Sequence, residues 1–341
     1  MRLVLLPETW HLQQINLLNA YLMPPLQKVN LGFFPTPLHP LKRIVKNLPY
    51  ELWIKRDDQT GLATGGNKCR KLEYLLAEAL AQGADTVLTA GAQQSNHCRQ
   101  TAAACAALGL ECHLMLGGVP PAVETGNLKL SRLLGAHIHF TGQNRKGEAL
   151  PALYRRLQDA GKRCYVIPYG GSNALGACGF VEAMAELKEQ TAQLALSFDY
   201  IFFASSSGGT QAGMMVGSAL YRLPARLMPV RIDKEPVEGA ALQKKVNDLV
   251  AALAPLWGIQ ADNIPPCPLL TDYDAAGYAV LTPQEQRLME EVARTEGILL
   301  DPVYTARAFY AMYDHMKKKQ LPEGSRVLFW HTGGIPALWA Y

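Results

Sequence analysis

Short runs of apolar residues alternate with longer amphipathic stretches along most of the chain. The run 200–204 is apolar throughout, and the run 86–90 contains only threonine besides apolar residues, which is typical of strands buried on both faces of a parallel sheet. The pattern predicts strands at 52–56, 86–90, 111–116, 136–140, 163–168, 200–204, 227–232 and 326–330. It predicts helices after residue 67 and at 96–108, 125–134, 147–160, 175–190, 210–222, 239–256, 283–295 and 304–319. Because strands and helices alternate, we expect an α/β fold with open parallel sheets flanked by helices.

One expected helix carries a lysine at the head of its buried face. Its apolar stripe comprises Leu72, Leu75, Leu76, Ala79 and Leu80. Lys68 continues this stripe, Asn67 is the expected N-cap, and Gly65-Gly66 would let the backbone approach a bound group. A buried lysine amine is costly unless it is paired, neutral or covalently engaged, and pyridoxal phosphate forms its Schiff base with such a lysine. The alternative is a lysine whose stem packs while its amine reaches water.

Two further stretches lie in turns that connect the end of an expected strand to the start of an expected helix, which is where open α/β sheets bind ligands. In Gly91-Ala92-Gln93-Gln94-Ser95-Asn96-His97, Ser95 and Asn96 can cap the next helix, whose free N–H groups would suit a carboxylate. In the stretch 205–213, the three serines and the adjacent glycines Gly208 and Gly209 form a donor-rich nest suited to a phosphate monoester. This stretch matches neither of the nucleotide-binding signatures GxxxxGK(S/T) and GxGxxG. The alternative for the stretch 91–97 is a plain helix cap, and the alternative for 205–213 is a glycine- and serine-rich turn that binds no ligand.

The remaining chemical candidates are weaker by themselves. His331-Thr332-Gly333-Gly334 follows the last expected strand, so the Thr332 hydroxyl could reach a ring nitrogen. Tyr278 and Tyr304 are the candidate tyrosines, although tyrosines are more often half-buried core residues than acid or base groups.

Length, composition and charge narrow the class of protein. The 341 residues suggest two domains, or one large domain with an insertion, and 49% hydrophobic with 18% charged residues is an ordinary globular composition. The net charge of +4 and the short run Lys317-Lys318-Lys319 argue against nucleic-acid binding. No apolar stretch approaches membrane-spanning length, and Pro7 and Glu8 interrupt the start too early for a signal peptide. We therefore expect a cytoplasmic protein with neither a membrane nor a nucleic acid as partner.

The cysteines and histidines predict neither disulfides nor a metal site. The seven cysteines are an odd number without CxxC spacing, which favours free thiols in a reducing compartment. The eight histidines form no HExxH pattern. His137 and His139 alternate along an expected strand, and we expect no metal there.

Taken together, five motifs in register closely resemble the D-cysteine desulfhydrase and 1-aminocyclopropane-1-carboxylate (ACC) deaminase family. They are Gly65-Gly66-Asn67-Lys68 with Arg70-Lys71-Leu72-Glu73, Gln94-Ser95-Asn96-His97, the stretch 205–213, Asp301-Pro302-Val303-Tyr304 and His331-Thr332-Gly333-Gly334. The likeness runs from about Phe34 to the C-terminus and implies the two-domain pyridoxal phosphate fold type II, which is tryptophan synthase β-like. It implies a large domain of 1–69 plus 177–341, with 1–30 as an N-terminal extension, a small domain of 70–176, and a homodimer.

The resemblance also implies a role for each matching residue. Lys68 would form the Schiff base with pyridoxal 5'-phosphate, Lys71 would reach its phosphate, and Asn96 would bind its phenolic oxygen. Ser95 and the amide of His97 would hold the substrate carboxylate, with Asn96 beside them, and Tyr278 and Tyr304 would flank the substrate. The phosphate loop would comprise Ser205, Ser206, Ser207, Gly208, Gly209 and Thr210.

Two departures from ACC deaminases bear on the substrate. Those enzymes carry a glutamate after the tyrosine of the Asp-Pro-Val-Tyr motif, where this chain has Thr305, so Thr332 becomes the candidate partner of the pyridine nitrogen. A neutral hydroxyl leaves the cofactor a weaker electron sink, which suits elimination of a good β-leaving group. His97, where ACC deaminases tend to have glutamine, points the same way. D-cysteine desulfhydration is therefore expected; ACC deamination, sulfite release from cysteate, amino-acid racemisation and a non-enzymatic, cofactor-binding relative remain alternatives.

Overall fold

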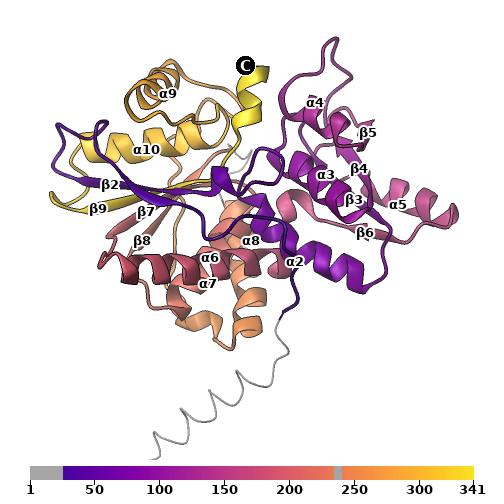
Figure 1. Ribbon diagram of the computed structural model, residues 1–341, viewed down its shortest axis with the longest axis horizontal. Helices are drawn as coiled ribbons and strands as arrows, with labels where there is room; N and C mark the ends of the chain where they lie inside the picture. Colours follow the sequence, from indigo (N-terminus) through magenta and orange to yellow (C-terminus); the bar gives the residue numbers. More distant parts are fainter. Residues whose placement is uncertain (1–25, 234–239) are drawn as a thin grey trace, which may run out of the picture.

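The computed structural model describes residues 26–233 and 240–341, so most of the expected N-terminal extension lies outside the described residues. Two sheets form the framework of the described chain (Figure 1). The first sheet has the strand order β1-β2-β9-β7-β8, with β1 antiparallel to β2 and the other strands parallel. Its strands are β1 (Leu38–Leu41), β2 (Glu51–Arg56), β7 (Tyr200–Ser205), β8 (Arg226–Arg231) and β9 (Arg326–His331).

Helices cover both faces of the first sheet. In the view of Figure 1, α9 (Pro283–Glu296) and α10 (Thr305–Lys317) lie above it and α6 (Ala174–Gln193) and α7 (Gly209–Leu220) below. Alternate residues of β7 enter two separate cores, Phe202 the one with α9 and α10 and Phe203 the one with α6 and α7. A Cβ on Gly213 of α7 would come within 2.4 Å of a carbonyl of α6, so this glycine permits the close contact of the two helices. Helix α8 (Ala240–Leu253) packs outside α7.

The second sheet is entirely parallel, in the order β5-β4-β3-β6. Its strands are β3 (Thr86–Gly91), β4 (Glu111–Leu116), β5 (His137–Phe140) and β6 (Cys164–Val166). One face packs against α2 (Lys68–Ala81), α3 (Asn96–Leu108) and α4 (Gly126–Leu133), and the other against α5 (Leu150–Asp159). The buried stripe of α2, including Leu72 and Leu75, belongs to this second core, while α2 also packs along α6.

The predicted strands and helices are all present, with ends that differ by a few residues. The pattern did not predict the strand β1, which is short and contains Pro40; a proline lacks an N–H and suits a sheet edge. The pattern did not indicate the short 3-10 segments Asp57–Gln59, Tyr169–Gly171, Ala261–Asn263 and Ile335–Ala340, and it placed most of Ala254–Trp257, also 3-10, in the preceding helix. The domain boundaries at 69/70 and 176/177 stay a prediction.

Two global expectations concern membranes and disulfides. In the described ranges no helix is both long and apolar enough to cross a bilayer. All seven cysteines are free thiols, as the sequence predicted.

Candidate active site

A cavity lies where the carboxyl ends of strands from both sheets meet. Its empty space is about 600 Å³, counting the opening to solvent. The residues around it come from the starts of α2, α3 and α10 and from the ends of β6, β7 and β9 with the turns that follow them. They are Asn67, Lys68, Ser95, Asn96, His97, Tyr169, Gly170, Ala204, Ser205, Ser206, Ser207, Gly208, Thr210, Tyr304 and Thr332. None of these described lining residues is acidic, so the cavity is built for an anion or a neutral polar group.

Lys68 is the first residue of α2 and reaches the cavity, as the sequence predicted. Burial lowers the pKa of its amine to about 8, and the nearby positive charge of Lys245 acts in the same direction. An amine with this pKa is neutral often enough near physiological pH to act as a nucleophile or base. The expectation that Asn67 caps α2 is wrong, because Asn67 is itself helical and its amide donates instead to the Thr210 hydroxyl at 3.3 Å.

Lys71 lies one turn behind Lys68 and does not line the cavity. Its Nζ donates to the Gly170 carbonyl at 3.2 Å and to Ser172 Oγ at 3.1 Å. Burial, followed by the charge of Lys68, lowers the pKa of Lys71 well below its usual value. Among the described residues neither lysine has an acidic partner within ion-pair distance. Two adjacent amines in such a place call for a bound anion.

The turn before α7 gathers hydroxyls and amides around this pair of lysines. Ser172 Oγ lies 2.7 Å from Ser207 Oγ and accepts from the Gly209 amide at 3.3 Å. A Cβ on Gly209 would approach Lys71 Nζ to 2.8 Å, so a side chain here would occupy the space between amine and helix start. Gly208 has a φ of +85°, which a glycine adopts without strain. Free N–H groups, hydroxyls and an amine converge here, as in a phosphate site.

Ser95 begins α3 as a true N-cap, since its Oγ accepts from the Cys98 amide at 3.2 Å. The hydroxyl proton of Ser95 remains available toward the cavity. Asn96 Oδ1 accepts from Asn127 Nδ2 at 2.8 Å, which leaves the Asn96 NH₂ as its free donor. Asn127, buried on α4, therefore orients Asn96, a role that sequence reasoning missed.

The tautomer of His97 follows from its neighbours. Thr89 donates its hydroxyl proton to the Ile167 carbonyl at 2.9 Å, so the His97 Nε2–H must donate to the same Thr89 oxygen at 2.9 Å. Burial, with the charges of Lys68 and Lys71, lowers the pKa of His97 well below its usual value, so the ring is neutral. Its Nδ1 is a buried acceptor with no partner among the described residues.

The two candidate tyrosines form a pair, of which only Tyr304 lines the cavity. Their hydroxyl oxygens are 2.7 Å apart and their rings meet edge to face. Burial is the main cause that raises the pKa of both phenols, so both are protonated at neutral pH. Tyr278 acts on the cavity through Tyr304.

Thr332 and Thr305, the two threonines considered as partners of the ring nitrogen, have different surroundings. Thr332 follows β9 and lines the cavity. Thr305 is fully buried and outside the lining, because its hydroxyl is bonded to the Asp301 carboxylate at 2.7 Å at the start of α10. The hydroxyl available to a ring nitrogen is therefore that of Thr332.

The two glycines before Lys68 serve the chain itself, which corrects the expectation that they admit a ligand. A Cβ on Gly65 would lie 2.0 Å from the Asp58 carbonyl oxygen, and one on Gly66 would lie 2.5 Å from the Gln100 amide. Their φ values of +71° and +129° suit glycine alone. The glycines thus let the loop fold tightly under the cavity and bring Lys68 to its position.

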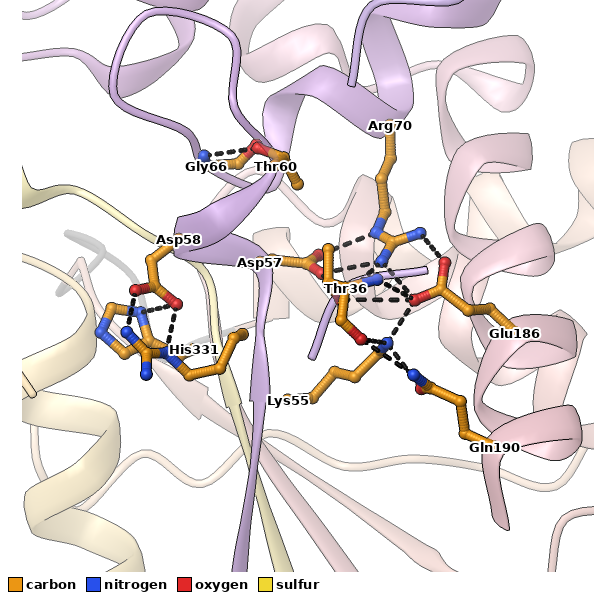
Figure 2. Close-up of polar contacts among 11 residues, drawn as sticks. Thr36, Lys55, Asp57, Asp58, Thr60, Gly66, Arg70, Glu186, Gln190 and His331 are labelled. Carbon is orange, nitrogen blue, oxygen red and sulfur yellow. Dashed lines mark hydrogen bonds and ion pairs between the residues drawn. The ribbon is translucent and has the colours of Figure 1, made fainter. Parts of the chain in front are cut away.

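A buried ionic network fixes the start of α2 from below (Figure 2). Arg70 binds the Asp57 carboxylate through Nε at 2.9 Å and Nη2 at 2.8 Å, and reaches Glu186 of α6 at 2.8 Å. Lys55 of β2 pairs with the same Glu186 and donates to the Gln190 side chain at 2.7 Å. In Figure 2 Arg70 extends from α2 to lie between Asp57 and Glu186. The network joins β2, α2 and α6, so the helix that carries Lys68 cannot rotate freely.

The structure brings together most of the residues expected at the site. Lys71, Gly209 and Tyr278 stand directly behind the lining, and the other expected residues line it. Sequence reasoning missed Tyr169, Gly170 and Ser172, although they follow β6 just as the other turns follow their strands. The strand-end rule applied to the stretch 169–173 would have found them.

Comparisons with known proteins show which proteins the whole chain is similar to. Residues 29–333 match a family model described as pyridoxal-phosphate dependent enzyme. The chain is 42% identical to a D-cysteine desulfhydrase of Klebsiella pneumoniae (strain 342), over 90% of this chain and 94% of that protein. It is 40% identical to a D-cysteine desulfhydrase of Serratia proteamaculans (strain 568), over 90% and 93% of the two chains. A crystal structure of an ACC deaminase homologue superposes with a TM-score of 0.85 at 34% identity, over 94% of this chain and 98% of the other.

Proposed function

The chain belongs to the pyridoxal-phosphate dependent enzymes, and we propose that it is a D-cysteine desulfhydrase, which converts D-cysteine and water to pyruvate, hydrogen sulfide and ammonia. The observation that carries this proposal is the 40–42% identity to D-cysteine desulfhydrases over 90% of the chain, together with Lys68 in a cavity lined by no described acidic residue.

The residues of the cavity fit pyridoxal phosphate. Lys68 and Lys71 are adjacent amines without an acidic partner in the described chain, and they face the donor-rich turn before α7. Lys68 would hold the aldehyde carbon as a Schiff base, while Lys71 and the turn 205–210 would hold the phosphate. The Asn96 NH₂ would donate to the phenolic oxygen, and Thr332 would face the ring nitrogen. When bound, the cofactor supplies an electron sink for the α-carbon of the substrate.

The chain's own residues would then position the substrate and move one proton. The Ser95 hydroxyl and the His97 backbone N–H, at the start of α3, would hold the substrate carboxylate. The Lys68 amine, once released, would take the α-proton, which its lowered pKa permits. Sulfide would leave from the β-carbon, and hydrolysis of the remaining carbon skeleton gives pyruvate and ammonia. Tyr304, backed by Tyr278, would flank the substrate in its protonated form.

The residues expected around the pyridine ring of the cofactor are neutral, which favours elimination of a thiolate over opening of the cyclopropane ring of ACC. Thr305 is engaged by Asp301, and Thr332 is the hydroxyl on the cavity. A hydroxyl does not keep a proton on a pyridine nitrogen, so the electron sink is weaker than with a carboxylate partner. A thiolate is a good leaving group and needs less electron withdrawal than a cyclopropane ring. The 34% identity to an ACC deaminase homologue keeps ACC as the second candidate substrate.

The test is to mix the purified, cofactor-loaded protein with D-cysteine, L-cysteine, ACC and both enantiomers of cysteate. We expect pyruvate and sulfide chiefly from D-cysteine, and no product with Lys68→Ala. Pyruvate with sulfite from cysteate would show that cysteate, and not D-cysteine, is the substrate. Formation of 2-oxobutyrate from ACC would refute the argument from Thr305. Interconversion of enantiomers without pyruvate would identify a racemase. A protein that binds pyridoxal phosphate but turns over none of these amino acids would favour the non-enzymatic relative.

We extend the proposal to a homodimer acting in the cytoplasm. The free state of all seven cysteines fits a reducing compartment. Light scattering after gel filtration would test the dimer, and fractionation of cells that express the chain would test its location.

A further inference from the structure

A cluster of imidazoles and one carboxylate lies on the second sheet, away from the cavity. In the register of β4 and β5, His113 pairs with His137 and Met115 with His139. Because side chains alternate along a strand and paired residues share a face, Glu111, His113, His137 and His139 all lie on one face of the sheet. The sequence showed only the alternation of His137 and His139; the strand pairing adds the other two.

On the face of the sheet that carries the histidines, α5 packs over β3 and β6 and leaves β4 and β5 more open. Cys112 and Leu114 of β4 and Ile138 of β5 point to the opposite face, into the core with α2 and α3. The cluster therefore combines a buried His113, a half-buried Glu111 and a His137 whose side chain is 55% exposed. A solvent ion can reach it, and its backbone is held by a parallel sheet.

The contacts in the cluster bring three ligand atoms together. Glu111 Oε1 lies 2.8 Å from His113 Nε2 and 3.5 Å from His137 Nε2, and all three atoms lie within 4.8 Å of one another. In a tetrahedral zinc site with bonds near 2.0–2.1 Å, ligand atoms are about 3.3 Å apart. The spacing observed here brackets that value. The rings of His113 and His137 are stacked, with centroids 4.6 Å apart and 16° between their planes, so one ring must turn before both nitrogens face the same ion. The exposed side chain of His137 has room to do so.

We propose that Glu111, His113 and His137 form a binding site for a divalent transition-metal ion of the Zn²⁺ class. The three ligand atoms are Glu111 Oε1, His113 Nε2 and His137 Nε2, and water would complete the coordination. His113 Nδ1 lies 3.0 Å from His139 Nε2. Without a metal, the neutral His113 ring donates its Nε2–H to the Glu111 carboxylate, and its Nδ1 accepts from His139 Nε2–H. A metal on Nε2 would move the His113 proton to Nδ1, which could then donate to His139 Nε2, so His139 is the positioning residue of the site.

The cations around the site set its strength. Lys162, which follows α5, binds the other carboxylate oxygen of Glu111 at 2.5 Å, and its side chain is 42% exposed. Arg156 of α5 adds positive charge beside His139. Lys162 competes with the metal for the Glu111 carboxylate. However, Lys162 binds Oε2 and not the ligand atom Oε1, and its exposed side chain can move into solvent. Because Glu111 begins β4 and the cavity lies at the carboxyl ends of the strands, the ion would brace the sheet without entering the reaction.

The experiment is equilibrium dialysis of the cofactor-loaded, full-length protein against Zn²⁺, with bound zinc measured by atomic absorption. The wild type should retain about one Zn²⁺ per chain more than His137→Ala, since loss of one of three ligands opens the site. His139→Ala should bind the ion about 10- to 100-fold more weakly, as expected for loss of a ligand's hydrogen-bond partner. Lys162→Ala should bind it more tightly, because the competing amine is gone.

The control variant is His39→Ala, which removes a histidine of the first sheet and should leave zinc binding unchanged. The yellow colour and circular dichroism of each variant report whether it has folded, and His137→Ala changes an exposed side chain only. Equal zinc retention by the wild type and His137→Ala would overturn the proposal, as would a loss that His39→Ala reproduces. Unchanged binding in both Lys162→Ala and His139→Ala would refute the ligand assignment.

Discussion

At the residue scale, the reactivity of this chain is concentrated in one amine. Lys68 begins α2 at the edge of the cavity, where burial and then the charge of Lys245 lower its pKa to about 8. Its hydrogen bond with Lys71 acts in the opposite direction and is outweighed. Lys68 is thus prepared for nucleophilic addition by its surroundings.

This predicts the pH dependence of cofactor loading. Schiff-base formation needs the unprotonated amine, so the rate at which apoprotein and pyridoxal phosphate form the yellow chromophore should rise with pH and level off above about 8. Stopped-flow absorbance over the neutral to alkaline range measures it, with Lys68→Ala as a control that forms no chromophore at this site. A rate still climbing toward 10.5, the usual pKa of a lysine, would contradict the prediction.

At the scale of elements, the position of α2 depends on ionic groups that are largely buried. Burial by itself would raise the pKa of Glu186, but Arg70 and then Lys55 outweigh it and lower the pKa to about 2. Burial lowers the pKa of Lys55 in spite of Glu186, so the network rests chiefly on the pairing of Arg70 with its two carboxylates. Breaking such a pair leaves a buried charge uncompensated.

The network predicts a stability difference that depends on pH. A carboxyl with a lowered folded pKa stabilises the fold above its unfolded value, here 4.5, and loses that contribution as the pH falls toward about 2. The shift corresponds to about 3 kcal/mol. Glu186→Gln should therefore lower the free energy of unfolding by about 3 kcal/mol at neutral pH and by much less near pH 2.

Urea unfolding of the wild type and Glu186→Gln at a series of pH values measures this difference. Glu189→Gln is the matched control, because Glu189 is an exposed residue on the same helix. A difference between wild type and Glu186→Gln that stays constant from neutral pH down to about 2 would show that the carboxylate charge is not its source.

At the scale of the whole molecule, the two sheets meet beside the cavity through a polar bridge. Arg145, in the loop after β5 of the second sheet, pairs with Asp233 after β8 of the first sheet at 3.1 Å. Its guanidinium also lies 4.6 Å from the centre of the Tyr278 ring. These contacts hold the two sides of the cavity together next to the tyrosine pair.

Removal of this bridge should weaken substrate binding more than folding. Arg145→Ala should raise KM for D-cysteine about tenfold, since an exposed ion pair and a cation–π contact together contribute about 1–1.5 kcal/mol. Steady-state kinetics and thermal unfolding check this, with Arg132→Ala as the control, because Arg132 pairs with Glu124 within the second sheet's own segment. An unchanged KM would show that the bridge does not keep the cavity closed.

Much of the fold and of the candidate site could be predicted from the sequence, because the signals are local. Buried parallel strands are largely apolar and helices carry a periodic stripe, so the α-helices and all the strands except β1 were visible along the chain. The helical stripe located Lys68, and the turns at strand ends located Ser95 and the turn 205–210. The five motifs in register further indicated the family. The match over residues 29–333 confirmed a pyridoxal-phosphate dependent enzyme, and the 40–42% identity to D-cysteine desulfhydrases confirmed the narrower family.

Only the tertiary structure decided which residues support that site and what else the chain can bind. Asn127 and Ser172 act on Asn96 and Lys71 across large sequence separations, and Gly65 and Gly66 contact the chain's own atoms. The cluster of Glu111, His113 and His137 depends on the register of two strands. Local pattern sets whether a residue is in a strand or helix, but side chains meet through packing between elements, which no single stretch of sequence encodes.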